Sequence, residues 1–239
     1  MKPFEEWTVL PHGKLTSIAE GLLTVVGDLH MPLGDFPRRM TVARLRDGRL
    51  VIYSAIALHE DEMRALERYG TPRFLVVPGE LHRMDAKIWK DRYPDMTVIA
   101  PAGARAKIEP VVHVDVTSVE LGDPEVHVVT MPGTDDGEAA LVVERPSGTT
   151  LVVNDLIWNV GHRPGVGGWL LKVAGFTGKE PKIPPIAALK GIKDKRAFGE
   201  QLEAWARLPN LRRIVVSHGD VVEGDAPAVL RSLASRLAA

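Results

Sequence analysis

The 239-residue chain contains no cysteine. This absence excludes disulfides, zinc sites built from thiolates, and thiol nucleophiles. Long hydrophobic runs are also missing: no stretch approaches 18 consecutive apolar residues, so no membrane-spanning helix is predicted. The first residues lack the apolar core of a signal peptide, which leads us to expect a cytoplasmic protein.

The chain also lacks an excess of either positive or negative charge. The chain has 30 basic and 31 acidic side chains, a net charge of −1. Nucleic acids and anionic membranes favour basic patches, so we expect neither as a partner. A chain of this length buries roughly 70% of its unfolded surface. We expect one domain over residues 1–239, because no segment has the composition of a linker.

Two hairpins stand out in the order of predicted elements. One turns at Asp47-Gly48, the strongest short-range hairpin signal, and the other turns at residues 146–148. Short apolar runs predict further strands at 74–78 and 97–101, a strand running into a loop over 125–133, and a strand ending in His-Gly-Asp over 212–220. Helices are predicted at 59–69, 82–94, 193–208 and 225–238. A single parallel sheet would not need two hairpins, so this order favours two mixed sheets with helices outside.

Polar side chains follow four of the predicted strands, where a rigid scaffold positions functional loops. The four groups are His82 with Asp85, Thr134 with Asp135 and Asp136, Asp155 alone, and His218 with Asp220. Asp155 ends an apolar run in "TLVVNDLIWN" (150–159). A carboxylate out of water is costly without a partner charge or metal. We therefore expect these groups to share one edge of the fold.

This order resembles the metallo-β-lactamase superfamily over roughly residues 20–222. The resemblance implies an α+β fold, a four-layer αββα sandwich with a metal site at one edge. Asp155 in "VVND" stands where the family has its bridging aspartate, and His218 in "VVSHG" where it has its final histidine. "RMTVARLRDGRLVIYSAIAL" and "VVNDLIWN" look most like a poorly characterised bacterial branch with a degenerate signature.

Other ligand positions of the family are changed. Thr134 in "MPGTDDG" replaces the lone histidine. The first signature, His-x-His-x-Asp-His, corresponds to "VVPGELHRMD". Aligned without a gap, its ligand positions hold residues that are not usual ligands: Gly79, Leu81, Arg83 and Met84. With one inserted residue, His82 and Asp85 fall on the second and last histidine positions, and both alignments remain open.

The resemblance implies a metallo-hydrolase-like protein with a reduced site. One zinc ion would lie on Asp155, His218 and one of His82 or Asp85, since catalytic zinc takes about three protein ligands. Activated water would attack an ester, lactone, thioester or amide carbonyl. The alternative is a binding protein for a small ligand or partner, in which the metal is lost and Asp155 pairs with His218 structurally.

Purely structural roles are also open for the remaining candidates. His82 can be a residue at the start of a helix, with Asp85 favouring the positive end of its dipole. Asp135, expected with Thr134 to line a pocket or supply a substitute ligand, is also a common turn residue. The irregular section 158–185 predicts a lid or pocket wall containing Trp158, Trp169 and Phe176, or a simple cap on the core.

Overall fold

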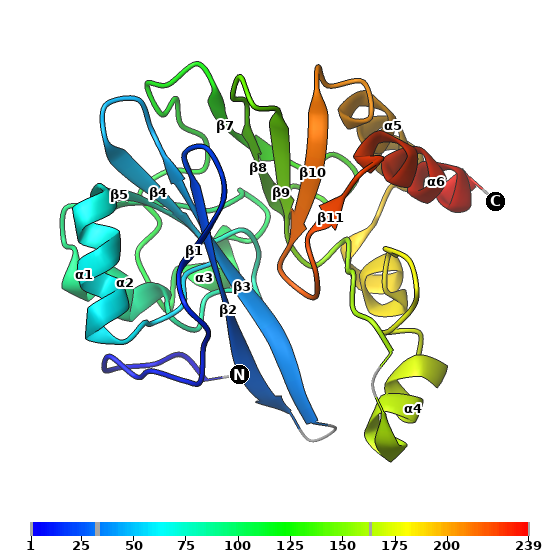
Figure 1. The fold of residues 1–239 in the computed structure, drawn as a ribbon, viewed down its shortest axis with the longest axis horizontal. Helices are drawn as coiled ribbons and strands as arrows, with labels where there is room; N and C mark the ends of the chain where they lie inside the picture. The colour runs from blue at the N-terminus through cyan, green and yellow to red at the C-terminus, as the bar shows by residue number, and fades with distance from the viewer. Residues whose placement is uncertain (1, 32–33, 163, 239) are drawn as a thin grey trace.

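The structure is a computed structural model that describes residues 2–31, 34–162 and 164–238 (Figure 1). Two mixed sheets form its centre. The first has the order β1-β2-β3-β4-β5-β6, with bounds Thr16–Ala19, Leu22–Met31, Gly34–Arg44, Arg49–Tyr53, Thr71–Val76 and Thr97–Ile99. The second has the order β11-β10-β9-β8-β7, with bounds for β7 to β11 of Val126–Thr130, Ala139–Val143, Thr149–Val153, Leu211–Val216 and Val222–Glu223.

Helices cover the outer faces of both sheets (Figure 1). The α-helices α1 to α6 span Glu60–Tyr69, Ala86–Arg92, Arg105–Ile108, Gly165–Val173, Lys195–Trp205 and Ala226–Ala238, and a π-helical turn, η1, spans Ala187–Gly191. Helices α1, α2 and α3 pack on the first sheet, and α5 and α6 pack on the second. The predicted αββα sandwich is confirmed.

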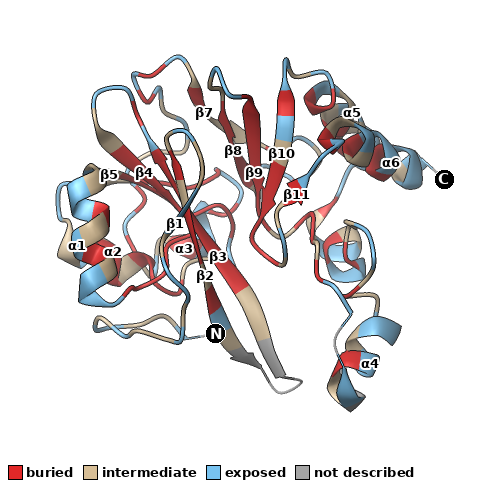
Figure 2. Cartoon of the chain, in the orientation of Figure 1, coloured by how far each residue is buried: buried red, intermediate tan, exposed pale blue. Residues whose placement is uncertain are grey.

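The sheets meet through alternate side chains of their strands. On β4, Val51 and Tyr53 point toward the second sheet, while Leu50 and Ile52 point toward the helices. This is the period of two expected of a pleated strand. Strands β8 and β9 are buried along their whole length (Figure 2) because helices cover one face and the first sheet covers the other.

Both predicted hairpins are present, as β3–β4 and β8–β9. Gly48 has a φ of 88°, which explains why glycine follows Asp47 at the first turn. Parallel pairing joins β4, β5 and β6, and also β9 and β10. The carboxyl ends of β9 and β10 therefore lie side by side, where Asp155 and His218 follow.

One predicted boundary is wrong in a way that affects the site. The helix expected over 82–94 begins only at Ala86, because the chain first makes turns in which His82 N donates to Gly79 O at 3.2 Å. His82 and Asp85 therefore do not share a helical face. Within the described residues, no helix is long and apolar enough to cross a membrane.

Candidate metal centre

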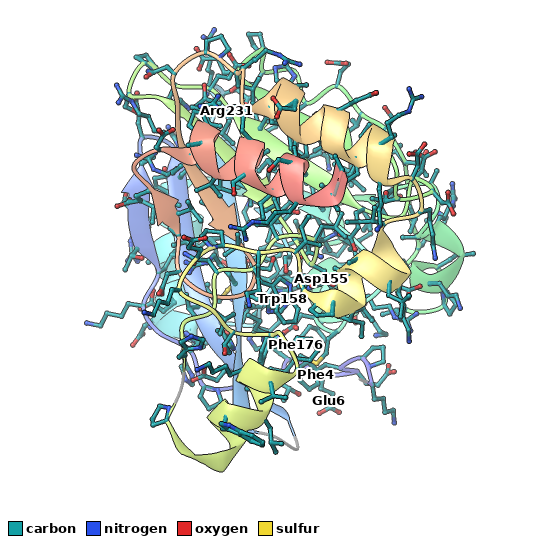
Figure 3. The ribbon with its side chains drawn as sticks, turned by 90° about the vertical axis from the view of Figure 1, so that its right-hand side faces the viewer. Phe4, Glu6, Asp155, Trp158, Phe176 and Arg231 are labelled. Atoms are coloured by element: carbon teal, nitrogen blue, oxygen red, sulfur yellow. The ribbon has the colours of Figure 1, made fainter. Side chains whose placement is uncertain are left out.

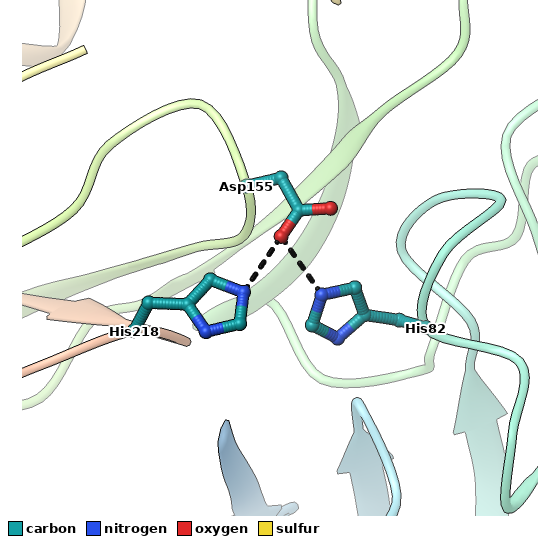
Figure 4. A group of neighbouring side chains, drawn as sticks. All are labelled: His82, Asp155 and His218. Carbon is teal, nitrogen blue, oxygen red and sulfur yellow. Dashed lines mark hydrogen bonds and ion pairs between the residues drawn. The ribbon is translucent and has the colours of Figure 1, made fainter. Parts of the chain in front are cut away.

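Three side chains converge at one edge of the sandwich (Figure 4). The Oδ1 atom of Asp155 lies 2.9 Å from Nε2 of His82 and 2.9 Å from Nε2 of His218. One nitrogen or oxygen from each residue lies within 4.8 Å of the other two. The side chains are only 9–14% exposed, so the carboxylate has little access to bulk water.

Both sheets contribute to this cluster. His82 belongs to the turns between β5 and α2, so the first sheet positions it. Asp155 and His218 follow the parallel strands β9 and β10 of the second sheet. Gly219 must stay small because its φ is +103° and a Cβ there would lie 2.0 Å from the carbonyl oxygen of Asn159. The close backbone contact fixes the loop that carries His218.

A second layer of hydrogen bonds orients the two imidazoles. His218 Nδ1 lies 2.7 Å from the carbonyl oxygen of Pro37, and His82 Nδ1 lies 2.7 Å from Oγ of Ser54. A carbonyl only accepts, so Nδ1 of His218 must carry the proton. In a neutral ring, Nε2 then presents its lone pair to Asp155. Outer partners of this kind are typical of metal-binding histidines.

The charge of Asp155 is held by these histidines. Burial alone raises the pKa of its carboxyl group, but the charges and hydrogen bonds of His82 and His218 outweigh burial and hold the pKa well below its usual range. A lone pair on His218 Nε2 facing a carboxylate oxygen at 2.9 Å would be repulsive. The contact therefore requires either a proton on Nε2 or a cation that both atoms would hold.

A second carboxyl group lies behind the cluster. Glu138 Oε2 accepts a hydrogen bond from Asn154 Nδ2 at 3.3 Å, and Asn154 Oδ1 accepts one from Ser217 Oγ at 2.6 Å. Burial, followed by the charge of Asp155, raises the pKa of Glu138 well above its usual value. Gly79 makes room for this group, since a Cβ there would lie 2.3 Å from Oε1 of Glu138.

Aromatic rings cover one side of the cluster. The ring centroid of Trp158 lies 4.8 Å from that of His218 and 5.5 Å from that of Phe176, and Phe36 lies 5.0 Å from both His218 and Trp158. Trp158 thus packs directly on His218, and Phe176 packs on Trp158. By contrast, the side chain of Trp169 is 61% exposed on α4. In Figure 3, Trp158 and Phe176 lie between Asp155 and α4.

Asp85 does not join the cluster, which corrects its expected place as a possible ligand. Its carboxylate forms a buried ion pair with Arg38 of β3, and its Oδ1 accepts a hydrogen bond from the backbone N–H of Ala57 at 2.9 Å. Burial raises the pKa of Asp85, although Arg38 opposes this shift. Asp85 directly precedes α2, so these bonds tie the start of this helix to β3 and to the backbone that follows β4.

The polar groups of the turn after β7 bond within the turn itself. Thr134 is buried, donates to the carbonyl oxygen of Met131 at 2.7 Å and accepts from the N–H of Gly137 at 3.2 Å. Asp135 is exposed and has a φ of 52°, so it is a turn residue. The expectation that they line the pocket is therefore not supported by their hydrogen bonds, which shape the turn itself.

Sequence reasoning missed the partners that hold the histidines. Ser54 directly follows β4 and has a φ of 58°, but a lone serine gives no signal of its partner. Pro37 acts through its backbone carbonyl, which no side-chain pattern reveals. Arg39 donates to the carbonyl oxygens of Val216 at 3.0 Å and Gly219 at 2.7 Å, on both sides of His218.

Comparison with known proteins identifies solved structures that share this fold. No family model matches the sequence, and no curated protein matches it either. Among solved structures, 215 chains match. The fold is that of the metallo-β-lactamases. The metallo-β-lactamase FIM-1 of Pseudomonas aeruginosa, in its mono-zinc form, is 13% identical, with a TM-score of 0.63 over 95% of this chain and 96% of that one.

Other matches have the same character. The metallo-β-lactamase DIM-1 is 11% identical, with a TM-score of 0.63 over 96% of this chain and 99% of that chain. A metallo-β-lactamase from Pontibacter korlensis is 12% identical, with a TM-score of 0.62 over 93% and 98%. Identities this low establish a shared architecture, and the activity of this chain has to be argued from its own residues.

Proposed function

We propose that this chain is a metallo-hydrolase-like protein whose reduced site holds one zinc ion on His82, Asp155 and His218. The observation that carries the proposal is the bond from His218 Nδ1 to the carbonyl oxygen of Pro37, which directs the Nε2 lone pair at Asp155. Two imidazole nitrogens and one carboxylate oxygen are a usual donor set for catalytic zinc. The mono-zinc form of the FIM-1 enzyme shows that the fold accommodates a single ion.

Such an ion supplies activated water near neutral pH and polarises a carbonyl group. The chain supplies the surroundings. Ser54 and Pro37 fix the two imidazoles, and Trp158 shields one side of His218 from water. The reaction class we propose is hydrolysis of an ester, lactone, thioester or amide.

A second candidate is a binding protein without catalysis. The observation that favours it is that Asp155 Oδ1 is within hydrogen-bond distance of both histidines. A proton on His218 Nε2 satisfies that contact as well as a metal does. In this case, the three residues hold the two sheets together and Trp158 lines a pocket for a small ligand.

Metal analysis of the purified protein tests the proposal. After chelator treatment and dialysis against zinc, we expect about one bound equivalent in the wild type. Asp155→Ala and His218→Ala should lose it, while the control His162→Ala, outside the cluster, should keep it. A wild type that stays well below one equivalent in excess zinc would refute the metal site.

An activity assay then separates the two candidates. Zinc-loaded and zinc-free protein are compared on an aryl ester, a lactone, a thioester and an anilide. Hydrolysis that needs zinc and disappears in His218→Ala supports the hydrolase. Little or no bound zinc, together with no hydrolysis of any of the four classes, supports the binding protein.

A further inference from the structure

Exposed apolar side chains are unevenly distributed over the described residues. Among the large hydrophobic residues that are exposed, five fall within a stretch of 21 positions: Trp169, Leu170, Val173, Ile186 and Leu189. Val173 is 67% and Leu189 is 78% exposed. Large exposed apolar patches on a soluble protein commonly mark an interaction site.

These residues come from neighbouring helices. Trp169 and Val173 are four positions apart on α4, so they share one face. The end of α4 touches the segment before η1, because a Cβ on Gly175 would lie 2.8 Å from Cγ of Pro185. Figures 1 and 3 both show η1 beside α4, and Figure 2 shows that most of α4 is exposed. We call the five side chains the α4–η1 surface.

Basic residues are frequent in the segment that carries this surface. Residues 160–193 contain six basic side chains and one acidic side chain, a formal charge of +5 in a chain whose net charge is −1. The acidic residue, Glu180, forms an ion pair with Arg236 at 2.9 Å, so its charge is already compensated. Lys172, Lys179 and Lys190 are exposed. The nearly balanced charge of the whole chain therefore includes a local excess of basic residues.

We propose that the α4–η1 surface docks on an anionic lipid bilayer. Exposed tryptophan and aliphatic side chains insert at the headgroup boundary, and lysines around them attract anionic lipids. A symmetric contact between two copies would place equal positive charges against each other. A nucleic acid would use the lysines but would leave Trp169 and Leu189 without an apolar partner. An anionic bilayer offers a partner both to the apolar side chains and to the lysines.

Vesicle co-sedimentation tests this proposal in the full chain. We expect binding to vesicles of phosphatidylcholine and phosphatidylserine in a 7:3 ratio, weak binding to pure phosphatidylcholine, and loss of binding at high salt. Lys179→Gln with Lys190→Gln should weaken binding roughly 25-fold, since each basic residue near the surface strengthens binding about fivefold. The matched control, Lys14→Gln with Lys107→Gln, removes the same charge elsewhere and should bind like the wild type.

The apolar half needs a variant of its own. Trp169→Ser with Val173→Ser should weaken vesicle binding at least tenfold, whereas Trp169→Phe should retain most of it. Circular dichroism confirms that each variant is folded. Equal binding to neutral and anionic vesicles, or no binding, would overturn the proposal. So would a dimer in sedimentation velocity that Trp169→Ser abolishes, or duplex DNA binding that is stronger than vesicle binding and insensitive to that change.

Discussion

At the scale of single residues, neighbouring carboxyl groups respond to the same environment in opposite ways. Asp155 has two imidazoles within 2.9 Å and keeps its charge. Burial raises the pKa of Glu138, the charges of Asp155 and Glu80 add to this effect, and the amide hydrogen bond from Asn154 opposes it. One group is therefore suited to hold a cation and the other to hold a proton.

The raised pKa of Glu138 has a consequence for stability. The folded protein keeps this proton above pH 4.5, the ordinary value, where the unfolded chain has released it. Stability therefore falls as pH rises from about 4.5 toward the folded-state pKa. In metal-free protein, Glu138→Gln should show a smaller fall than the wild type in urea unfolding between pH 4.5 and 8.

The control for this measurement is Glu200→Gln, an exposed site on α5 where the same substitution should leave the pH dependence unchanged. Parallel curves for the wild type and Glu138→Gln would mean that Glu138 ionises normally in the folded protein.

At the scale of elements, β3 organises both halves of the site. Its neighbouring residues Arg38 and Arg39 point to opposite faces. Arg38 pairs with Asp85 ahead of α2, and Arg39 holds the backbone on both sides of His218. Three residues of one strand, with the carbonyl of Pro37 included, thus fix elements from both sheets.

The buried pair of Arg38 and Asp85 gives a prediction for this element. Asp85→Ala should lower the free energy of unfolding by roughly 3–5 kcal/mol, because it leaves a buried guanidinium without its partner. Arg38 already has two buried nitrogens, Nε and Nη2, without a hydrogen bond to the described residues. Arg38→Met combined with Asp85→Leu should therefore cost less than Asp85→Ala alone, as measured by urea denaturation.

Should the double replacement cost as much as Asp85→Ala or more, the unpaired guanidinium would not be the source of the lost stability. In that case, the pair would not be what fastens α2 to β3.

Much of the fold was predictable because its signals are local. Asp47-Gly48 predicts one hairpin. The apolar runs before Asp155 and His218 predict two strands that end at the site. The start of α2 was not predictable, because turns at 79–85 replace the first helical turns. The role of Asp85 was missed for a related reason: its partner, Arg38, lies 47 residues away in sequence, and no local pattern connects them.

At the scale of the whole molecule, the ligands of the proposed site come from different sheets. His82 depends on the first sheet, while Asp155 and His218 depend on the second. A bound ion would therefore link the two halves of the sandwich, each of which packs its own helices in a separate outer core.

Zinc should consequently raise the melting temperature. A ligand at 100 times its Kd stabilises the folded state by about 2.7 kcal/mol. For a chain of this size that corresponds to roughly 5–10 °C. Calorimetry should show this shift in the wild type and none in either His82→Ala or His218→Ala. A shift that persists in both variants would place the zinc elsewhere.

Because Arg38 and Arg39 point to opposite faces of β3, the number of residues in this strand is also constrained. Moving β3 by one residue along its neighbours would exchange the two faces, carrying Arg39 toward the helices and Arg38 toward the loop of His218. Neither guanidinium would then meet its acceptors, and two buried cations would be stranded at once. Single-residue insertions or deletions in this strand should thus be tolerated far less well than substitutions, and the segment offers a natural marker for aligning distant sequences.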